Sequence, residues 1–379
     1  MACYNKNMPS FFFVFIILAL IVLFFTHLAV YKGLVDIFTL SSGMTILWLK
    51  IFLIVFGLAF IAAIFLSFRY NNLFTRIFYM ISASWYGFLL YLLLAVAIYA
   101  VLATIFGNTV FLVWIGKILV VFALIISAYG LWNAEQITLT RYNVSIPNLP
   151  ASWQGKKAVW ISDIHLGQIL GVEYSRRIVD MINKENPDIV FIGGDLYDGV
   201  KIDEVAAIAP FKNLHSSLGV YFITGNHEEF GDKTHFINTI KMAGIRVLDN
   251  EMINIDGLNI IGVNDGDSTE AKVFETILTG LNLPTQAGIQ KGASTILLKH
   301  QPSGLDIAEK FGINLQISSH THRAQMYPLS YVTKLMYKGY DYGQKNYGNM
   351  QVIVSDGVGT WGPPLRVLTK SEIVVLNFK

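Results

Sequence analysis

Long apolar runs fill the first third of the chain, and much shorter ones recur through the rest. Four of the long runs reach the roughly 20 residues that a helix needs to cross a bilayer; they are residues 11–31, 45–68, 78–105 and 110–132. The first is too long for the apolar part of a signal peptide, and three more runs follow it. The pattern predicts a domain of four transmembrane helices over residues 1–134.

Beyond residue 134, short apolar runs alternate with polar segments rich in glycine. Helical spacing of apolar residues occurs at 174–183, 204–214 and 233–243. Strands are expected where short apolar or alternating runs end at turn residues, namely at 136–146, 252–255, 258–263, 350–354 and 372–378. The alternation predicts an α/β domain over residues 135–379, with sheets covered by helices and a β-rich second layer.

Five further short apolar runs end in residues that can bind a metal. These residues are Asp163 and His165, Asp195, Asn226 and His227, His300, and His320 and His322. Such runs predict buried strands, and ligands of α/β proteins bind beyond the carboxyl ends of strands. We therefore expect the five strand ends to bring these side chains to one edge of a sheet. Carboxylate and imidazole together suit Zn, Mn, Fe or Co rather than Ca, as in a two-metal hydrolase.

The composition supports a membrane part and argues against nucleic-acid binding. Of the 379 residues 54% are hydrophobic and 14% are charged, and the mean hydropathy is +0.50. A soluble domain carries about a quarter charged residues, so part of this chain is expected in lipid. The net charge of +2 is close to neutral, which argues against a nucleic-acid-binding protein.

Basic residues are distributed unevenly around the predicted spans. Those before the first span, between the second and third, and after the fourth are Lys6, Arg69, Arg76, Arg141, Lys156 and Lys157. The positive-inside rule then predicts both termini, and with them the α/β domain, in the cytoplasm. Lys117 lies inside the fourth span, where two interpretations stay open: a functional charge, or an amine that reaches the interface.

Taken together, the motifs resemble the signature of the calcineurin-like metallophosphoesterases. Asp163-x-His165, Gly194-Asp195, Gly225-Asn226-His227-Glu228, His300 and His320-x-His322 carry the resemblance, which covers residues 136–379. A membrane-anchored branch of the family, related to UDP-diacylglucosamine hydrolases, also has membrane spans ahead of such a domain. Segments 137–150 and 357–366 of this chain resemble that branch as well. The resemblance implies a four-layer α/β/β/α fold and two divalent metal ions.

Carried over by position, the resemblance also implies roles for single residues. The first metal would be held by Asp163, His165, Asp195 and His322, and the second by Asp195, Asn226, His300 and His320. His227 would act on the reacting phosphate, and Glu228 would orient its loop. In the last motif Ser319 replaces the usual glycine, which alters the turn if its φ is positive. Arg323 is either a contact for substrate phosphate or a solvated loop charge.

The sequence thus predicts a membrane-anchored, two-metal phosphoester hydrolase acting on a lipid or nucleotide-lipid phosphodiester or pyrophosphate. Tyrosines and lysines of residues 326–347 suit a membrane interface; the alternative is an ordinary β-rich segment packed on the core. The sequence leaves two other functions open. One is hydrolysis of soluble phosphoesters such as cyclic nucleotides or phosphoproteins. The other, a non-catalytic membrane scaffold or sensor, is disfavoured by the complete set of metal-binding residues.

Overall fold

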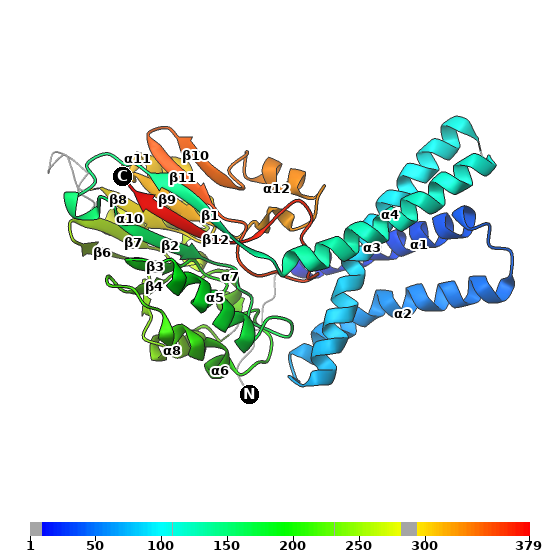
Figure 1. The fold of residues 1–379 in the computed structure, drawn as a ribbon, viewed down its shortest axis with the longest axis horizontal. Helices are drawn as coiled ribbons and strands as arrows, with labels where there is room; N and C mark the ends of the chain where they lie inside the picture. Colours follow the sequence, from blue (N-terminus) through cyan, green and yellow to red (C-terminus); the bar gives the residue numbers. More distant parts are fainter. Residues whose placement is uncertain (1–9, 108, 231, 282–293) are drawn as a thin grey trace. The chain divides into compact units, whose positions relative to one another are not determined.

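The structure, a computed structural model, describes residues 10–107, 109–230, 232–281 and 294–379 (Figure 1). The chain forms two compact units, Met1–Tyr129 and Gly130–Lys379. The first unit is helical. The second contains the α/β elements together with the last turn of the fourth long helix.

The four predicted spans are confirmed as four long helices: α1 (Ser10–Ile37), α2 (Gly43–Ser67), α3 (Leu73–Phe106) and α4 (Val110–Ala134). All four are long and apolar enough to cross a membrane. α3 starts earlier than residue 78 because Asn72 caps it: the Asn72 side chain accepts from Thr75 N, and the Thr75 side chain accepts from Asn72 N. In α4, the Lys117 amine lies 4.7 Å from the centre of the Trp114 ring, which favours a cation away from water.

Two six-stranded sheets form the centre of the second unit. In spatial order the first contains β1 (Ile137–Val144), β12 (Ser371–Phe378), β2 (Lys157–Ile161), β3 (Ile189–Ile192), β4 (Val220–Phe222) and β5 (Arg246–Val247). The second contains β10 (Gly343–Tyr347), β11 (Met350–Val354), β9 (Leu315–Ser318), β8 (Thr295–Leu298), β7 (Leu258–Gly262) and β6 (Glu251–Ile255). The expectation that all five strand ends lie at one edge of a single sheet was wrong. β2, β3 and β4 lie in the first sheet, whereas β8 and β9 lie in the second.

Helices cover the outer face of each sheet, so the predicted α/β/β/α layering is confirmed. α5 (Val172–Lys184), α6 (Glu204–Ile208) and α8 (Lys233–Met242) pack on the first sheet, and α10 (Ala271–Gly280) and α11 (Leu305–Lys310) on the second. Within β2, Val159 and Ile161 face the helices, whereas Trp160 lies in the core between the sheets. This alternation is the period of a strand that is buried on both faces.

The remaining elements are short. They are the helices α7 (Asn226–Phe230), α9 (Asp265–Ser268) and α12 (Ser330–Met336), and the 3₁₀ turns η1 (Ala151–Trp153), η2 (Ala209–Asn213) and η3 (His322–Ala324). The single helix expected at 204–214 was wrong: α6 ends at Ile208 and η2 follows. Pro210 stands at the start of η2, where its ring and missing N–H prevent the α-helix from continuing.

Candidate metal centre

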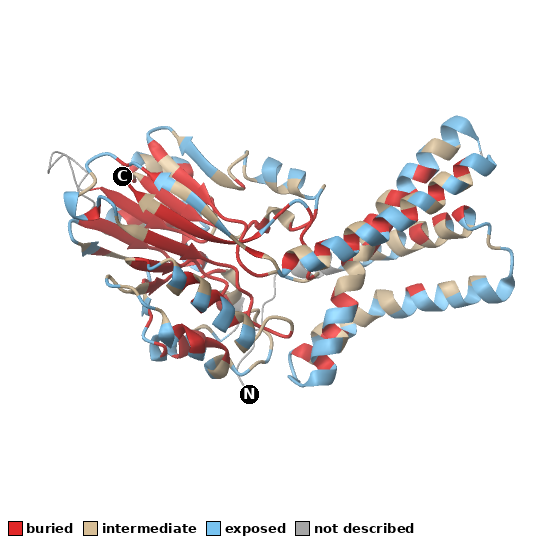
Figure 2. Ribbon diagram, in the orientation of Figure 1, coloured by how far each residue is buried: buried red, intermediate tan, exposed pale blue. Residues whose placement is uncertain are grey.

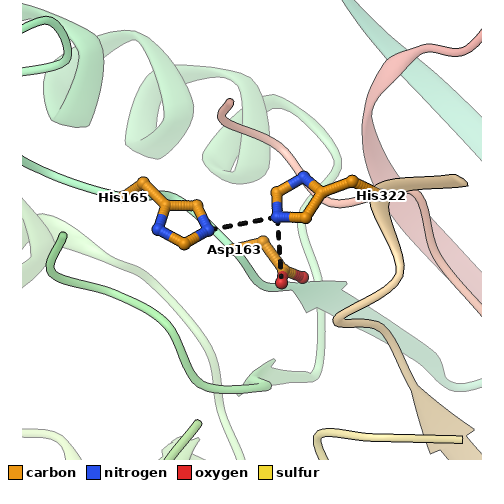
Figure 3. Close-up of side chains that lie close together, drawn as sticks. All are labelled: Asp163, His165 and His322. Carbon is orange, nitrogen blue, oxygen red and sulfur yellow. Dashed lines mark hydrogen bonds and ion pairs between the residues drawn. The ribbon is translucent and has the colours of Figure 1, made fainter. Parts of the chain in front are cut away.

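Asp163, His165 and His322 form the first cluster of the candidate centre (Figure 3). The two histidine Nε2 atoms lie 3.1 Å apart, and His322 Nε2 lies 3.4 Å from Asp163 Oδ1. All three side chains are buried. Asp163 Oδ1 has no hydrogen-bond partner among the described residues. Buried polar atoms normally have a partner, so converging carboxylate and imidazole atoms fit a divalent cation bound between them.

Asp195, His300 and His320 form a second cluster beside the first. His300 Nε2 lies 3.3 Å from Asp195 Oδ2 and 3.2 Å from both His320 Nδ1 and Asn226 Oδ1. At the other side of its ring, His300 Nδ1 donates to the carbonyl of Gly193 at 2.7 Å. This bond leaves the lone pair on Nε2, as metal binding by that atom requires.

Asp195 connects the two clusters. Its Oδ2 lies 3.9 Å from His165 Nε2 in addition to the 3.3 Å contact with His300. Close backbone approach permits this position: a Cβ on Gly225 would lie 2.2 Å from Asp195 Oδ1, and one on Gly194, where φ is +90°, would lie 2.4 Å from Gly225 N. Only glycine fits at these two positions.

Several site residues adopt strained backbone angles. Among non-glycine residues with positive φ are Asp163, His165 and Asp195 (each 51°), His320 (70°) and His322 (45°). Such angles persist where the surrounding structure fixes them, and they concentrate at functional sites. The positive angle of the last turn therefore falls on His320 rather than on Ser319. The Ser319 hydroxyl instead accepts from Trp160 Nε1 at 3.1 Å and bonds the Ser162 hydroxyl.

The Glu228 carboxylate holds two of the site loops together, as expected. It accepts the backbone N–H of Gly225 at 2.8 Å and of Asp195 and Leu196 at 2.9 Å each. Burial, reinforced by the charge of Asp195, raises the pKa of Glu228 to about 7, while the donated backbone N–H groups act against the shift.

Asp198 is a site residue that sequence reasoning missed. Its Oδ1 lies 3.4 Å from His165 Nδ1, and its carbonyl accepts from His227 Nδ1 at 3.2 Å. A carboxylate behind a metal-binding imidazole fixes the ring and its tautomer. The available signal was an acid three residues after Asp195, in the same strand-end loop.

Arg366 was also missed as a site residue. Its side chain is fully buried. Its Nη2 donates to the carbonyls of Asp356 and Gly359, at 2.7 Å each, and lies 3.2 Å from His322 Nδ1. The segment 357–366 resembles the membrane-anchored branch of the family, but its sequence pattern does not indicate that Arg366 contacts His322.

The electrostatics of the clusters differ from residue to residue. Burial raises the pKa of Asp163. Burial lowers the pKa of His165 and of His300, but Asp198 beside His165 and Asp195 beside His300 outweigh it, so both pKa values lie above the ordinary one. Burial raises the pKa of Asp195, but the charge and hydrogen bond of His300 outweigh it, so this pKa lies below its usual range. Burial and the charge of His300 lower the pKa of His320 to about 4. Burial, with the charges of His165 and Arg366, holds the pKa of His322 well below its ordinary value. Neutral imidazole is the form that binds metals.

Two residues with predicted substrate roles lie at the edge of the clusters. The His227 ring centre lies 4.7 Å from that of His165 and 5.9 Å from that of Trp361, whose side chain is 56% exposed. Arg323 is held within the protein: its Nε donates to the buried Asp356 at 3.0 Å, and its guanidinium lies 4.0 Å from the centre of the Tyr342 ring. The geometry thus gives Arg323 a structural partner, and its contact with substrate stays a prediction.

Comparison with known proteins identifies the family. The profile described as calcineurin-like phosphoesterase matches residues 156–324. A metallophosphoesterase of Aquifex aeolicus is 30% identical over 264 residues, which cover 68% of this chain and 97% of that protein. The chain belongs to the calcineurin-like metallophosphoesterase family. It is therefore a metal-dependent hydrolase, and the structure brings a candidate metal-binding cluster together.

Other relatives extend the similarity to the helical unit. A metallophosphoesterase of Campylobacter jejuni is 29% identical over 386 residues, covering 97% of this chain and 99% of that protein. A transmembrane protein with metallophosphoesterase domain from Danio rerio is 32% identical over 275 residues, covering 68% of this chain and 62% of that protein. With the four apolar helices, these similarities support a membrane localisation for the calcineurin-like metallophosphoesterase.

Proposed function

We propose that the protein is a membrane-anchored phosphoester hydrolase with two metal ions, in which residues 1–134 form the membrane domain and 135–379 the catalytic domain. The first ion would be held by Asp163, His165, Asp195 and His322, and the second by Asp195, Asn226, His300 and His320. The observation that carries the proposal is the position of Asp195 Oδ2, 3.9 Å from His165 Nε2 and 3.3 Å from His300 Nε2. One carboxylate oxygen is thereby shared by two sets of converging donors.

The donor set of imidazoles, carboxylates and one amide oxygen suits Mn, Zn, Fe or Co. The chemistry that two such ions supply when bound is the activation of water and the polarisation of phosphate oxygens. The protein residues supply position: Glu228 fixes the loops of Asp195 and Asn226, and Asp198 fixes the ring of His165. Both carboxylates thus hold the donors in place before substrate binds.

His227 is proposed to transfer a proton to the reacting phosphate group. Its Nδ1 donates to the Asp198 carbonyl at 3.2 Å, and the Asp198 carboxylate lies 3.9 Å from the same nitrogen. A proton on Nδ1 is thereby held, while burial and the charge of His165 lower the pKa of the ring and favour its neutral form. Nε2 is then the ring atom that can take up a proton and pass it to the departing oxygen.

The proposed substrate is a lipid or nucleotide-lipid phosphodiester or pyrophosphate. The last membrane helix ends at Ala134 and the first strand begins at Ile137, so a very short connector keeps the catalytic domain at the bilayer surface. The domain is then exposed to phosphate groups of membrane lipids at high local concentration. Its orientation toward the cytoplasm, argued from the flanking basic residues, belongs to the same proposal.

The test is hydrolysis of an aryl phosphodiester by the full-length protein in detergent, before and after removal of metal with a chelator. Activity should disappear with the metal and return with Mn or Zn. Asp195→Ala should abolish activity and lower the metal content below that of the parent, because it removes the shared oxygen. Asp306→Ala, an exposed aspartate at the start of α11, is the matched control. Full metal content in Asp195→Ala would contradict the assignment of Asp195 as the shared ligand.

A further inference from the structure

None of the residues of α12 is buried, whereas most strands of the same unit are (Figure 2). Leu335 is 80% exposed, Met336 69%, Tyr331 56% and Val332 52%. Contiguous exposed apolar side chains mark sites of interaction, because water solvates them poorly. These four residues, with Lys334 and Lys338, are called the α12 surface below.

The tyrosines of residues 340–347, which follow α12, behave differently. Tyr340 and Tyr347 pack against the core beneath the second sheet, and Tyr342 contacts Glu372 and Arg323. For these tyrosines the alternative of an ordinary β-rich segment holds. A β-rich segment packed on the core does not explain the exposed apolar side chains on α12.

The charges around the α12 surface are basic. Lys334, Lys338 and Lys345 are exposed, whereas Asp341, the acidic residue within 326–347, is buried. Amines beside exposed aromatic and aliphatic side chains suit an anionic lipid surface, where they meet the negative headgroups. The surface therefore matches lipid in charge as well as in apolarity.

Hydrogen bonds connect the chain before α12 to the last turn of α4. Val367 forms a bridge with Met326, and its carbonyl accepts from Tyr327 N at 3.1 Å. Beside it, the Gly130 carbonyl accepts from Arg366 N at 3.0 Å, and a Cβ on Gly130 would lie 2.9 Å from the Val367 side chain. One extended segment thus separates the end of the last membrane helix from the start of the α12 region.

α12 is also connected to the metal centre. The Tyr337 ring, at the end of the helix, has its centre 6.4 Å from that of His320. Asp341 joins the two regions: its carbonyl accepts from the Thr321 hydroxyl at 2.8 Å, and its carboxylate accepts from the Thr333 hydroxyl at 3.4 Å. The turn that carries His320 and His322 and the helix α12 are therefore one connected structure.

We propose that the α12 surface docks the catalytic unit onto the bilayer that holds the membrane helices of the same chain. The occupant is lipid because the surface is apolar and basic, and because the segment that supports it is bonded to the end of α4. Docking would bring lipid to the side of the metal centre where Tyr337 and His320 lie. The inference deepens the proposed function and rests on its membrane-borne substrate.

The experiment measures the depth of α12 in the full-length protein, reconstituted one chain per nanodisc. Cys3→Ser removes the one native cysteine, and Leu335→Cys then carries a nitroxide label. The label should collide with oxygen, which concentrates in lipid, more than with a water-soluble nickel complex. Met242→Cys is the control, a 67% exposed apolar residue at the end of α8; its label should favour the nickel complex.

Lipid composition and charge reversal provide the second arm. Insertion at position 335 should be deeper in discs of equal phosphatidylcholine and phosphatidylglycerol than in phosphatidylcholine alone, and Lys334→Glu with Lys338→Glu should abolish this difference. Leu335→Ser should lower hydrolysis of a lipid phosphodiester in the disc about tenfold, the value of one buried leucine. Its hydrolysis of a soluble aryl phosphodiester should be unchanged.

The docking would be overturned if the label at position 335 collided with the nickel complex as often as the label at position 242, in both kinds of disc. Protection that arises only in discs holding two chains would also overturn it, because it would mean a second copy as the occupant. Failure of the parent to hydrolyse even the soluble diester would refute the proposed function instead, while the depth measurement would still decide the docking.

Discussion

The location of His227 fits two roles, that of a metal ligand and that of a proton donor. A ring nitrogen of His227 lies near ligand atoms of His165 and Asp195, so the geometry alone permits a contact with metal. Its Nδ1, however, is bonded to the Asp198 carbonyl, and Asn226 supplies the loop's oxygen to the second cluster. A proton donor at this position accounts for both facts without an additional ligand.

His227→Ala should therefore keep both metals and lose about 10²–10⁴ in turnover, the usual contribution of a positioned acid or base. The measurement is kcat on an aryl phosphodiester together with metal content, with His235→Ala on α8 as control, since its side chain is 54% exposed. Near-normal turnover would exclude the catalytic role, and loss of one metal would make His227 a ligand.

Arg323 poses a different question, because Asp356 already neutralises its charge. Burial raises the pKa of Asp356 to about 6, and the charge of Arg323 acts against that shift. Arg323→Ala would leave this carboxyl buried without its partner and should destabilise the domain by about 3 kcal/mol. Adding Asp356→Asn should restore most of the loss in thermal unfolding. A raised KM that Asp356→Asn does not restore would instead assign Arg323 to substrate phosphate.

The site residues at strand ends could be predicted from the sequence, whereas the residues that position their side chains could not. Asp163, His165 and Asp195 follow apolar runs directly, so their convergence could be expected. Asp198 and Arg366 act through distances of 3.4 Å and 3.2 Å to histidines that other motifs supply. Neither distance follows from local spacing, because each depends on how loops from separate strands fold over the site.

At the scale of elements, apolar periodicity located the strands but did not assign them to sheets. β2 and β9 are both buried runs followed by candidate metal ligands, and yet they lie in different sheets. The local pattern also does not show that β12, from the end of the chain, inserts between β1 and β2. A pairing between residues more than 200 positions apart leaves no mark on the local pattern.

The junction between α4 and the catalytic unit depends on Asn133. Its side chain donates to the carbonyls of Arg366 and Thr369, at 2.9 Å and 3.0 Å. Asn133→Ala should cost about 2 kcal/mol, near 1 kcal/mol per bond, and lower the Tm of the catalytic unit by roughly 5 °C. Gln136→Ala is the matched control, since the bond that its side chain donates to the Trp132 carbonyl is exposed. Equal Tm values for the two variants would show that the junction contributes no stability.

For the whole molecule, the number of spans and the loop charges give the same orientation. Four spans would return the chain to the side from which it started. Arg69 follows α2 and Arg76 lies in the first turn of α3, so the basic connection would then lie on the same side as both termini. A cytoplasmic active site would meet lipid-linked phosphates of the inner leaflet, whose anionic lipids also suit the lysines of the α12 surface.

A reporter enzyme fused after Lys379 should therefore be active only if it functions in the cytosol, because the positive-inside rule keeps the basic loop there. A reporter inserted between α1 (Ser10–Ile37) and α2 (Gly43–Ser67), after Ser41, should show the opposite result, since the predicted topology puts that connection across the membrane. The pair of fusions tests orientation and span count together. Extracytoplasmic activity at Lys379 with cytosolic activity at Ser41 would invert the topology. Equal activity at both positions would mean that an odd number of spans separates the start of the chain from its catalytic unit.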